Sequence, residues 1–113
     1  MPVLMPLKHH WFQILLALAT EDRHGSAIMR AVLEQSGGAL KLWPVMLYNS
    51  LEQLAEAGLI QEVAGEGRPE ESERRRYYRI TLAGRRALAD EADRMAHLAR
   101  AAKAQLSAKR GDA

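Results

Sequence analysis

The stretch that decides the fold spans residues 44–63 and reads PVMLYNSLEQLAEAGLIQEV. Its leucines recur at steps of four and three, so they share one face of a helix: Leu47, Leu51 and Leu54. Pro44 fits the first turn of that helix, where an amide N–H would have no partner. Gly58 fits the C-terminal stop, because that position takes a left-handed backbone. Apolar residues then come near alternation, which predicts a strand over residues 59–63.

Two further helices are predicted upstream, over residues 6–20 and 26–35. The first carries an apolar stripe at helical spacing: Leu7, Trp11, Ile14, Leu15 and Leu18. A polar break over residues 21–25 separates the two helices, and Gly37-Gly38 ends the second. Three short helices with a tight turn between the second and the third form a helix-turn-helix.

A β-hairpin wing is predicted directly after these helices. Residues 64–72 are rich in glycine, glutamate and proline, which predicts a loop. Residues 76–81 read RYYRIT, and their β-forming, alternating side chains predict the returning strand. The expected fold class is therefore mainly α with a small β-hairpin, a winged helix-turn-helix domain over residues 1–81.

A long helix is predicted next, from a Thr81 N-cap to about residue 107, because this segment is rich in helix formers and lacks proline. Such a helix would be roughly 40 Å long, too long for so small a core to cover. Its apolar residues form a thin seam: Leu88, Ala92, Met95, Leu98, Ala99, Ala102 and Leu106. We expect residues 82–113 to be a dimerisation helix and tail, with a second copy on the seam. The alternative is a solvated, frayed helix.

Composition limits the class of protein. The chain has 113 residues, 48% hydrophobic, with a net charge of +2 and no cysteine, which favours one folded domain without disulfides. No apolar run approaches the ~20 residues of a membrane span, and no signal peptide is evident, so a cytoplasmic protein is expected. The sequence contains no P-loop, G-x-S-x-G or histidine-rich metal motif. We therefore expect no enzymatic activity, no cofactor and no metal.

Five segments occur in a particular order along the chain: FQILLAL at 12–18, His24-Gly25, Leu47-Tyr48, Gly58-Leu59-Ile60 and RRRYYRIT at 74–81. Their order and spacing resemble the PadR family of transcriptional regulators. The resemblance extends from residue 7 to about residue 100 and implies a homodimer that binds double-stranded DNA. It also implies a regulator that is usually a repressor and is often released by a small molecule. A single final helix is typical of the compact members of the family.

Two segments depart from the family pattern. Ser26 stands where the family usually has an aromatic residue, and residues 43–46 read WPVM where small or polar residues are usual. The family positions commonly help to hold DNA phosphates. The alternative function is therefore a winged-helix protein-interaction module, or a degenerate regulator that does not read DNA.

The third helix is expected to lie in the major groove, with residues that point away from the leucine stripe facing the DNA. Its outward residues are predicted to include Val45, Met46, Tyr48, Asn49 and Gln53, and we expect the last four to contact DNA. The Asn49 and Gln53 amides, one turn apart, can pair bidentately with adenine; the alternative is that both are merely solvated. Tyr48 matches a family tyrosine and either donates to a phosphate or packs its ring at the helix edge. Glu52 and Glu56 are expected to face away from DNA.

Basic residues outside the third helix are predicted to contact phosphates. They are Lys41, just before the helix, and three wing arginines: Arg68, Arg74 and Arg76. The wing alternative is a solvated, salt-bridged hairpin. For Trp43 we expect a hydrophobic staple to the preceding element, the alternative being an apolar wedge at the groove.

Large apolar residues on the first and last helices form either a dimer interface or a cavity for a small aromatic or hydrophobic effector. They are Trp11, Phe12, Leu88, Met95, Leu98 and Ala102. The effector hypothesis depends mainly on the family resemblance.

Overall fold

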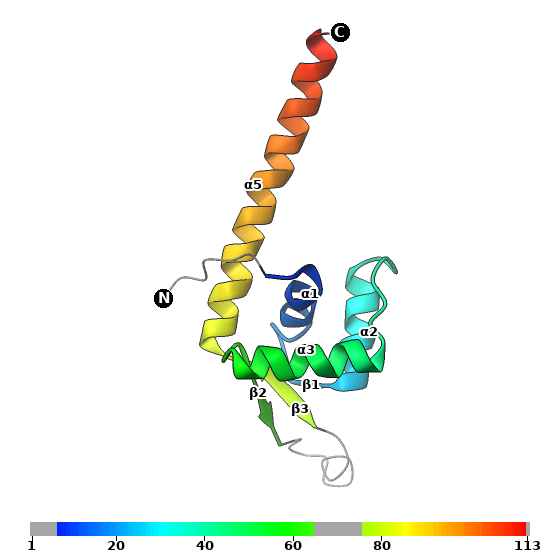
Figure 1. Cartoon of the computed structure of the whole chain (residues 1–113), viewed down its shortest axis with the longest axis vertical. Helices are drawn as coiled ribbons and strands as arrows, with labels where there is room; N and C mark the ends of the chain where they lie inside the picture. Colours follow the sequence, from blue (N-terminus) through cyan, green and yellow to red (C-terminus); the bar gives the residue numbers. More distant parts are fainter. Residues whose placement is uncertain (1–6, 65–75, 113) are drawn as a thin grey trace.

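A computed structural model of the chain describes residues 7–64 and 76–112. These residues form four helices and a small antiparallel sheet (Figure 1). The elements are, in order, α1 (His9–Ala17), β1 (Arg23–His24), α2 (Gly25–Gln35), α3 (Pro44–Glu56), β2 (Ile60–Val63), β3 (Tyr77–Ile80) and α5 (Leu82–Asp112). The mainly helical winged-helix fold that the sequence predicts is confirmed.

The hydrophobic core lies where α1, α2 and α3 meet the sheet. Its fully buried side chains come from the predicted apolar stripes: Ile14, Leu15, Leu18, Ile28, Val32, Leu47, Leu51 and Leu54. A polar clamp fixes α1 to α2, because the Gln35 amide donates to both the backbone and the side-chain oxygen of Gln13 at 2.7 Å. Gln13 is itself buried. This hydrogen bonding satisfies a polar group that would otherwise be costly to bury.

The first helix is shorter than predicted and is followed by a strand that the sequence pattern missed. α1 ends at Ala17 rather than near residue 20, and the supposed polar break contains β1. β1 pairs with β3, so that Arg23 lies opposite Tyr78 and His24 opposite Tyr77. The Arg23 guanidinium also donates to the Ala17 carbonyl at 2.7 Å, which satisfies an acceptor at the helix end. This short strand forms because it pairs with β3, which lies more than fifty residues further along the chain, and local sequence patterns do not record such pairing.

The sheet has the order β1-β3-β2, so β3 is its central strand. Tyr77 and Tyr78 are both buried, although successive side chains of a strand point to opposite faces. Tyr78 belongs to the core, whereas Tyr77 packs edge-on against the His24 ring at 5.4 Å between centroids. The His24 side chain, directly opposite on β1, therefore helps to bury Tyr77.

The junction between α3 and α5 depends on Thr81 and Gly84. Thr81 is the predicted N-cap: its hydroxyl accepts the Gly84 N–H at 3.0 Å and donates to the Gly58 carbonyl at 2.6 Å. Gly58 has φ +78°, as its predicted role as a helix stop requires. A Cβ at residue 84 would collide with the Leu59 carbonyl oxygen, so glycine allows α5 to begin directly against the end of α3.

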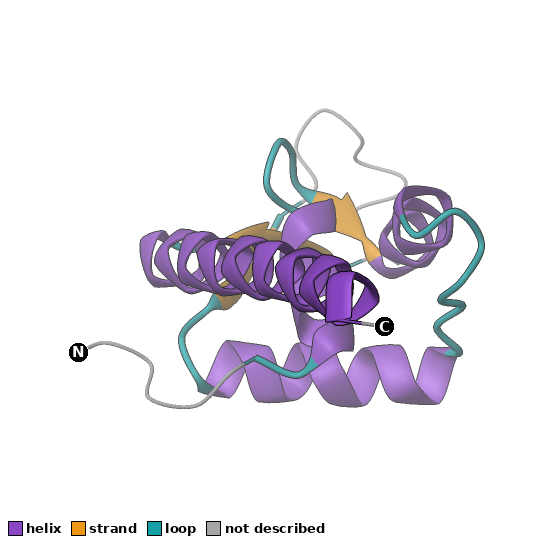
Figure 2. Ribbon diagram, turned by 90° about the horizontal axis from the view of Figure 1, so that it is seen from above, coloured by secondary structure: helices purple, strands orange, loops and turns teal. Residues whose placement is uncertain are grey.

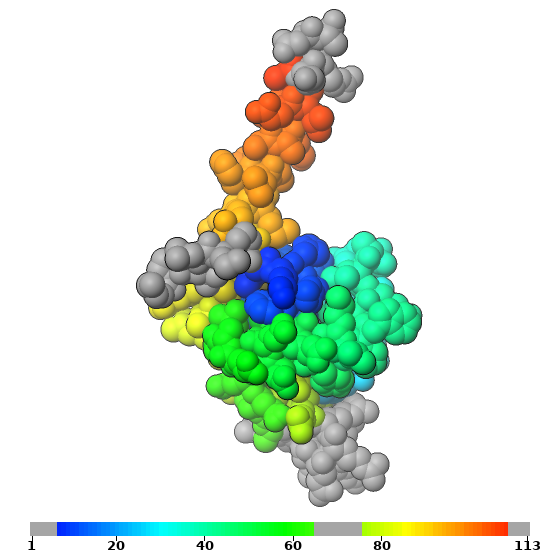
Figure 3. Space-filling view, in the orientation of Figure 1, coloured from blue at the N-terminus to red at the C-terminus, as the bar shows by residue number. Residues whose placement is uncertain are grey.

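α5 extends far beyond the body (Figures 1 and 3). Near its base Ala87 and Glu91 are buried and Leu88 packs against the core, but every described side chain from 92 to 108 is exposed. The molecule measures 63 × 33 × 23 Å along its principal axes. Figure 2, viewed from above, shows α5 projecting out of the helical body, with α3 lying along one flank. Among the described helices, none combines the length and apolar character that crossing a bilayer requires.

Candidate nucleic-acid interface

The outward surface of α3 is uncovered along its whole length (Figure 3). The predicted leucine stripe is buried together with Ser50, so the opposite side faces solvent. At about 100° per residue, the outward side chains form two i, i+4 rows that share one broad face, with Met46 beside the first row and Glu56 pointing between Val45 and Asn49. We call them the amide stripe, Val45, Met46, Asn49 and Gln53, and the acidic stripe, Tyr48, Glu52 and Glu56; all seven residues are exposed.

The acidic stripe bears on one expectation, which stays a prediction. Glu52 and Glu56 were expected to face away from the nucleic-acid surface, yet both are exposed, and Glu52 lies one turn from Asn49 on the outward side. α3 contains no lysine or arginine. The helix therefore offers Val45, Met46 and Asn49 near its N-terminus, whereas the Gln53 amide lies between the two glutamates towards its C-terminus. The N-terminal half is better suited to close approach to a polyanion than the C-terminal half.

Tyr48 packs its ring edge against the start of α2. A Cβ at residue 25 would collide with the Tyr48 hydroxyl and lie 2.9 Å from Cζ, so only glycine leaves room for the ring. The side chain is still 48% exposed. The ring therefore packs at a helix edge, as one alternative expected, and the hydroxyl lies beside the N-terminus of α2; its donation to a phosphate stays a prediction. Helix N-termini attract phosphate because their amide N–H groups lack partners.

His24 organises the same helix start. Its Nδ1 accepts the Ala27 N–H at 3.3 Å and thereby caps α2, while its ring packs against Tyr77. Burial, followed by the Glu62 carboxylate, raises the pKa of the nearby Tyr78 hydroxyl, and Tyr48 acts in the same direction. Tyr48 is thus close enough to interact electrostatically with the central strand of the wing sheet.

Lys41 and Trp43 form an exposed pair just before α3. The Lys41 ammonium lies 4.6 Å from the centre of the Trp43 ring, and Trp43 is 63% exposed. The expectation that Trp43 staples the helix to the preceding element is therefore wrong. Leu42 is buried instead, at the position before the N-cap, and so is Leu47 at the fourth helical position, which is the arrangement of a hydrophobic staple.

Of the three wing arginines predicted to contact phosphates, Arg76 lies within the residues that the structure describes. Arg76 is exposed and lies 3.6 Å from the Glu62 carboxylate, a contact between exposed groups that contributes little to stability. Arg68 and Arg74 lie outside the described residues. Two other arginines have structural partners: Arg79 makes a bidentate pair with Asp22 at 2.8 and 3.0 Å, and Arg23 pairs with Glu21 at 3.2 Å.

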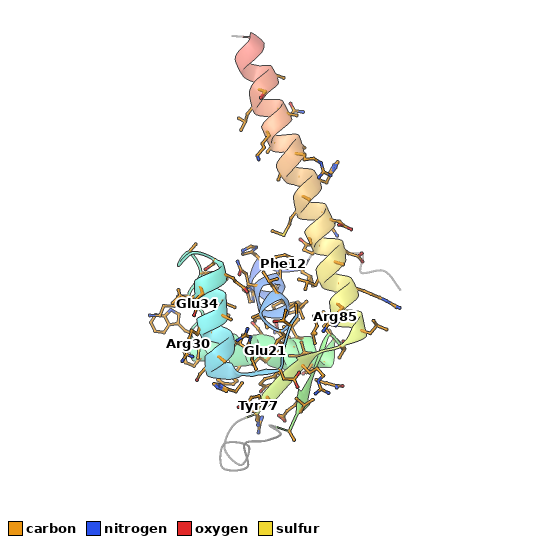
Figure 4. All side chains as sticks on the ribbon, turned by 180° about the vertical axis from the view of Figure 1, so that it is seen from behind. Phe12, Glu21, Arg30, Glu34, Tyr77 and Arg85 are labelled. Carbon is orange, nitrogen blue, oxygen red and sulfur yellow. The ribbon has the colours of Figure 1, made fainter. Side chains whose placement is uncertain are left out.

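The apolar residues predicted to form a dimer interface or an effector cavity have two different environments in the structure. Trp11 and Leu88 pack against the core of the same chain, whereas Met95, Leu98 and Ala102 are exposed along α5. Phe12 is half-buried and stacks on His9. Figure 4 shows Phe12 on the side of the body from which α5 projects, and Tyr77 on the opposite side, towards the hairpin. Phe12 and Tyr77 therefore lie at opposite ends of the body.

Trp11 has an unusual polar environment. Its Nε1 is buried and finds no acceptor in the part of the chain that the structure describes, while the Lys8 ammonium lies 5.1 Å from its ring. Burial, then Lys8 and His9, lowers the pKa of the adjacent His10. Within residues 7–64 and 76–112 no three potential metal ligands converge.

Sequence reasoning missed two residues of this surface. Val45 was placed on the outward face but not among the nucleic-acid contacts, although it is the most exposed large apolar residue of α3, at 75%. Its position near the helix start, one turn before Asn49, was the available signal. Gly25 was noted only as part of the His24-Gly25 segment of the family resemblance. Its close approach to Tyr48 depends on the tertiary structure, so the sequence assigned it no role.

Comparison with known proteins identifies relatives for most of the chain. A sequence model of the transcriptional regulator PadR-like family matches residues 14–90. No curated protein sequence matches the chain.

Several solved structures share the fold. A PadR family transcription regulator from Clostridium difficile has 18% identity and a TM-score of 0.74, over 88% of this chain and 99% of the other. A transcriptional regulator from Clostridium thermocellum has 24% identity and a TM-score of 0.69, over 82% and 88%. RosR of H. salinarum has 25% identity and a TM-score of 0.62, over 90% and 96%.

Proposed function

Because this chain belongs to the PadR-like family of transcriptional regulators, we propose that it acts as a homodimeric repressor that places α3 in the major groove of its operator. The family consists of DNA-binding transcription regulators rather than enzymes. The division into a DNA-binding unit, residues 1–81, and a dimerisation segment, residues 82–113, is part of the proposal. So is a cytoplasmic location.

The observation that carries the proposal is the uncovered outward face of α3. Its amide stripe has two groups that pair with base edges, and Lys41 lies beside the helix start. The N-terminus of α2, with the Tyr48 hydroxyl beside it, supplies a site for a backbone phosphate. Arg76 adds a positive charge on the wing. Base-reading and phosphate-binding groups thus occur together on one helix-turn-helix.

Dimerisation is supported by the uncovered part of α5. Beyond residue 91 every side chain of the helix that the structure describes is exposed, yet the seam still carries large apolar side chains such as Leu106, which is 66% exposed. Residues 92, 95, 99, 102 and 106 follow steps of three and four, the spacing of a coiled-coil seam. A second copy would cover this seam and set two α3 helices at a fixed separation, as a palindromic operator requires.

Titration of the full-length protein into generic duplex DNA tests the DNA-binding role. At about 50 mM salt we expect weak binding that decreases about tenfold or more at about 200 mM, because each phosphate contact releases counterions. Footprinting upstream of the protein's own gene should then reveal a protected inverted repeat. Absence of binding at low salt, with no footprint, would contradict the proposal.

A protein-interaction module is the second candidate. The exposed Trp43, Val45 and Met46 form an apolar surface at the start of α3, and Glu52 and Glu56 extend negative charge along it. Such a surface suits a protein partner better than a polyanion. The same titration separates the two candidates, because an interaction module would show neither DNA binding nor a steep salt dependence.

Release by a small hydrophobic effector is the last part of the proposal. Trp11 and Phe12 lie on α1, which packs against α5, and in the described part of the chain the buried Trp11 N–H lacks an acceptor. An aromatic ligand would be expected to change Trp11 fluorescence in a Trp43→Phe variant, which removes the second tryptophan. A panel of aromatic compounds that shifts neither this fluorescence nor the melting temperature would count against an effector.

A further inference from the structure

We infer that α3 reads A·T base pairs, with Val45 and Met46 against thymine methyl groups and Asn49 and Gln53 on adenine edges. This inference rests on the proposed DNA-binding function and adds the class of operator sequence. It concerns the amide stripe, whose composition differs from that of a helix built to recognise guanine.

The hydrogen-bonding inventory of α3 favours adenine. Guanine presents two acceptors, O6 and N7, and is read by the paired donors of arginine or by lysine. α3 contains neither residue. Asparagine and glutamine combine a donor and an acceptor, which match N7 and N6 of adenine. Asn49 and Gln53 are exposed and one turn apart, so both amides face the same groove.

The apolar members of the stripe supply the complementary contact. Val45 and Met46 are 75% and 44% exposed and are the second and third residues of α3. The N-terminal residues of a recognition helix are those that approach base edges. The thymine C5-methyl is the apolar group that the major groove presents there. Val45 lies one turn before Asn49, so a methyl contact and an amide contact fall on adjacent base pairs.

Glu52 is the residue of α3 that could recognise a different base pair. A carboxylate accepts from cytosine N4 and would select G·C instead. Glu52 lies on the acidic stripe, however, one turn beyond Tyr48, and further from the helix start than Val45, Met46 and Asn49. With Glu56 beside it and no basic residue on α3, its charge is repelled by the phosphates on both walls of the groove.

The first test is selection of tight-binding duplexes from a random library by the full-length protein. The expected result is an inverted repeat whose half-sites are A·T at the strongest positions. An Asn49→Ala variant should lose about tenfold in preference for A·T at one position. Half-sites dominated by G·C, with cytosine preference abolished by Glu52→Gln, would overturn the inference and assign the reading to Glu52.

The second test removes methyl groups alone. Replacing thymine by uracil in the selected duplex leaves every base-pairing group in place, so wild-type affinity should fall about fourfold for each methyl group contacted. In Val45→Ala the ratio of thymine to uracil affinity should fall about fourfold, because only the Met46 contact remains. Wild type and variant should bind the uracil duplex equally, which shows that the variant is folded. Glu56→Gln, on the acidic stripe, should retain the wild-type ratio.

Failure of this inference differs from failure of the proposed function. If duplexes are enriched but uracil substitution leaves wild-type affinity unchanged, the protein binds DNA without methyl contacts, and only the inference is overturned. If no duplex is enriched at about 50 mM salt, where nonspecific phosphate binding is strong, both the inference and the DNA-binding role are overturned.

Discussion

At the scale of single residues, three contacts give the candidate surface its shape. Gly25 leaves space for Tyr48, His24 caps the helix that begins there, and Lys41 stacks on Trp43. The charge and hydropathy patterns of the sequence do not indicate any of these contacts. Each contact nevertheless places a polar group on the outer surface. The chemistry of the surface therefore depends on small residues and caps as much as on the residues that face the DNA.

Gly25→Ala should displace Tyr48 and weaken DNA binding roughly tenfold, because the new Cβ would overlap the tyrosine hydroxyl. Helix propensity favours alanine over glycine by about 1 kcal/mol, so the unfolding free energy should decrease less than a steric clash alone would suggest. DNA affinity by fluorescence anisotropy and urea denaturation measure the two effects. In a Tyr48→Phe background the substitution should cost less affinity, because the closest atom is gone. Equal losses in both backgrounds would show that Gly25 acts independently of Tyr48.

Lys41→Ala should reduce the slope of log affinity against log salt by about one for each DNA-bound copy, because one phosphate contact is lost. Lys103→Ala is the matched control: it removes the same charge from an exposed position on α5, away from the body, and should leave the slope unchanged. Binding measured at four or more salt concentrations gives both slopes. Identical slopes for the two variants would remove Lys41 from the interface.

At the scale of elements, the connection from α3 to α5 is held by two hydrogen bonds and a close backbone approach. The Thr81 hydroxyl joins the last turn of one helix to the first turn of the other, and Gly84 permits their close approach. The direction of α5 relative to α3 is thereby set by local hydrogen bonds. Any dimer formed through α5 would transmit this direction to the spacing between the two recognition helices.

Thr81→Val should lower the free energy of unfolding by about 1–2 kcal/mol, because it keeps the shape but removes both a cap and a hydrogen bond to the Gly58 carbonyl. Thr81→Ser retains the hydroxyl and should lose far less. Urea denaturation followed by circular dichroism compares the three proteins. A valine variant as stable as the serine variant would mean that the hydroxyl contributes little to this junction.

At the scale of the whole molecule, a compact body carries a helix that it covers only at the base. α5 has 31 residues, roughly 46 Å of helix, against molecular extents of 63 × 33 × 23 Å. Isolated helices gain little stability in water without a packed face. The exposed seam therefore favours assembly, and the alanines at positions 92, 99 and 102 permit two helices to approach closely.

Ala102→Glu should convert a dimer to monomers, because it places a charge in the seam, whereas Ala104→Glu makes the same change on the opposite side of α5 and should not. Both positions are exposed in the single chain, so neither substitution should unfold it. Light scattering after size exclusion gives the mass directly. A monomeric wild type, or a dimeric Ala102→Glu, would contradict dimerisation through this seam.

The sequence by itself determined the helices, the hairpin strands and the core. Leucine spacing identified the buried side of α3, Pro44 and Gly58 marked its ends, and Thr81 marked the start of α5, because these signals depend on neighbours within one or two turns. The resemblance to one family added the DNA-binding role. Which outward residues contact DNA remains a prediction.

Only the tertiary structure decided the rest. β1 exists because β3 lies beside it, and Tyr77 is buried because His24 covers it. Trp43 is exposed because Leu42 occupies the site expected for it, and Gly25 matters because Tyr48 approaches it from another helix. Each of these outcomes depends on contacts between residues distant along the chain or in competition for one site. Local periodicity carries no information about such contacts, since it records only which side of an element is apolar.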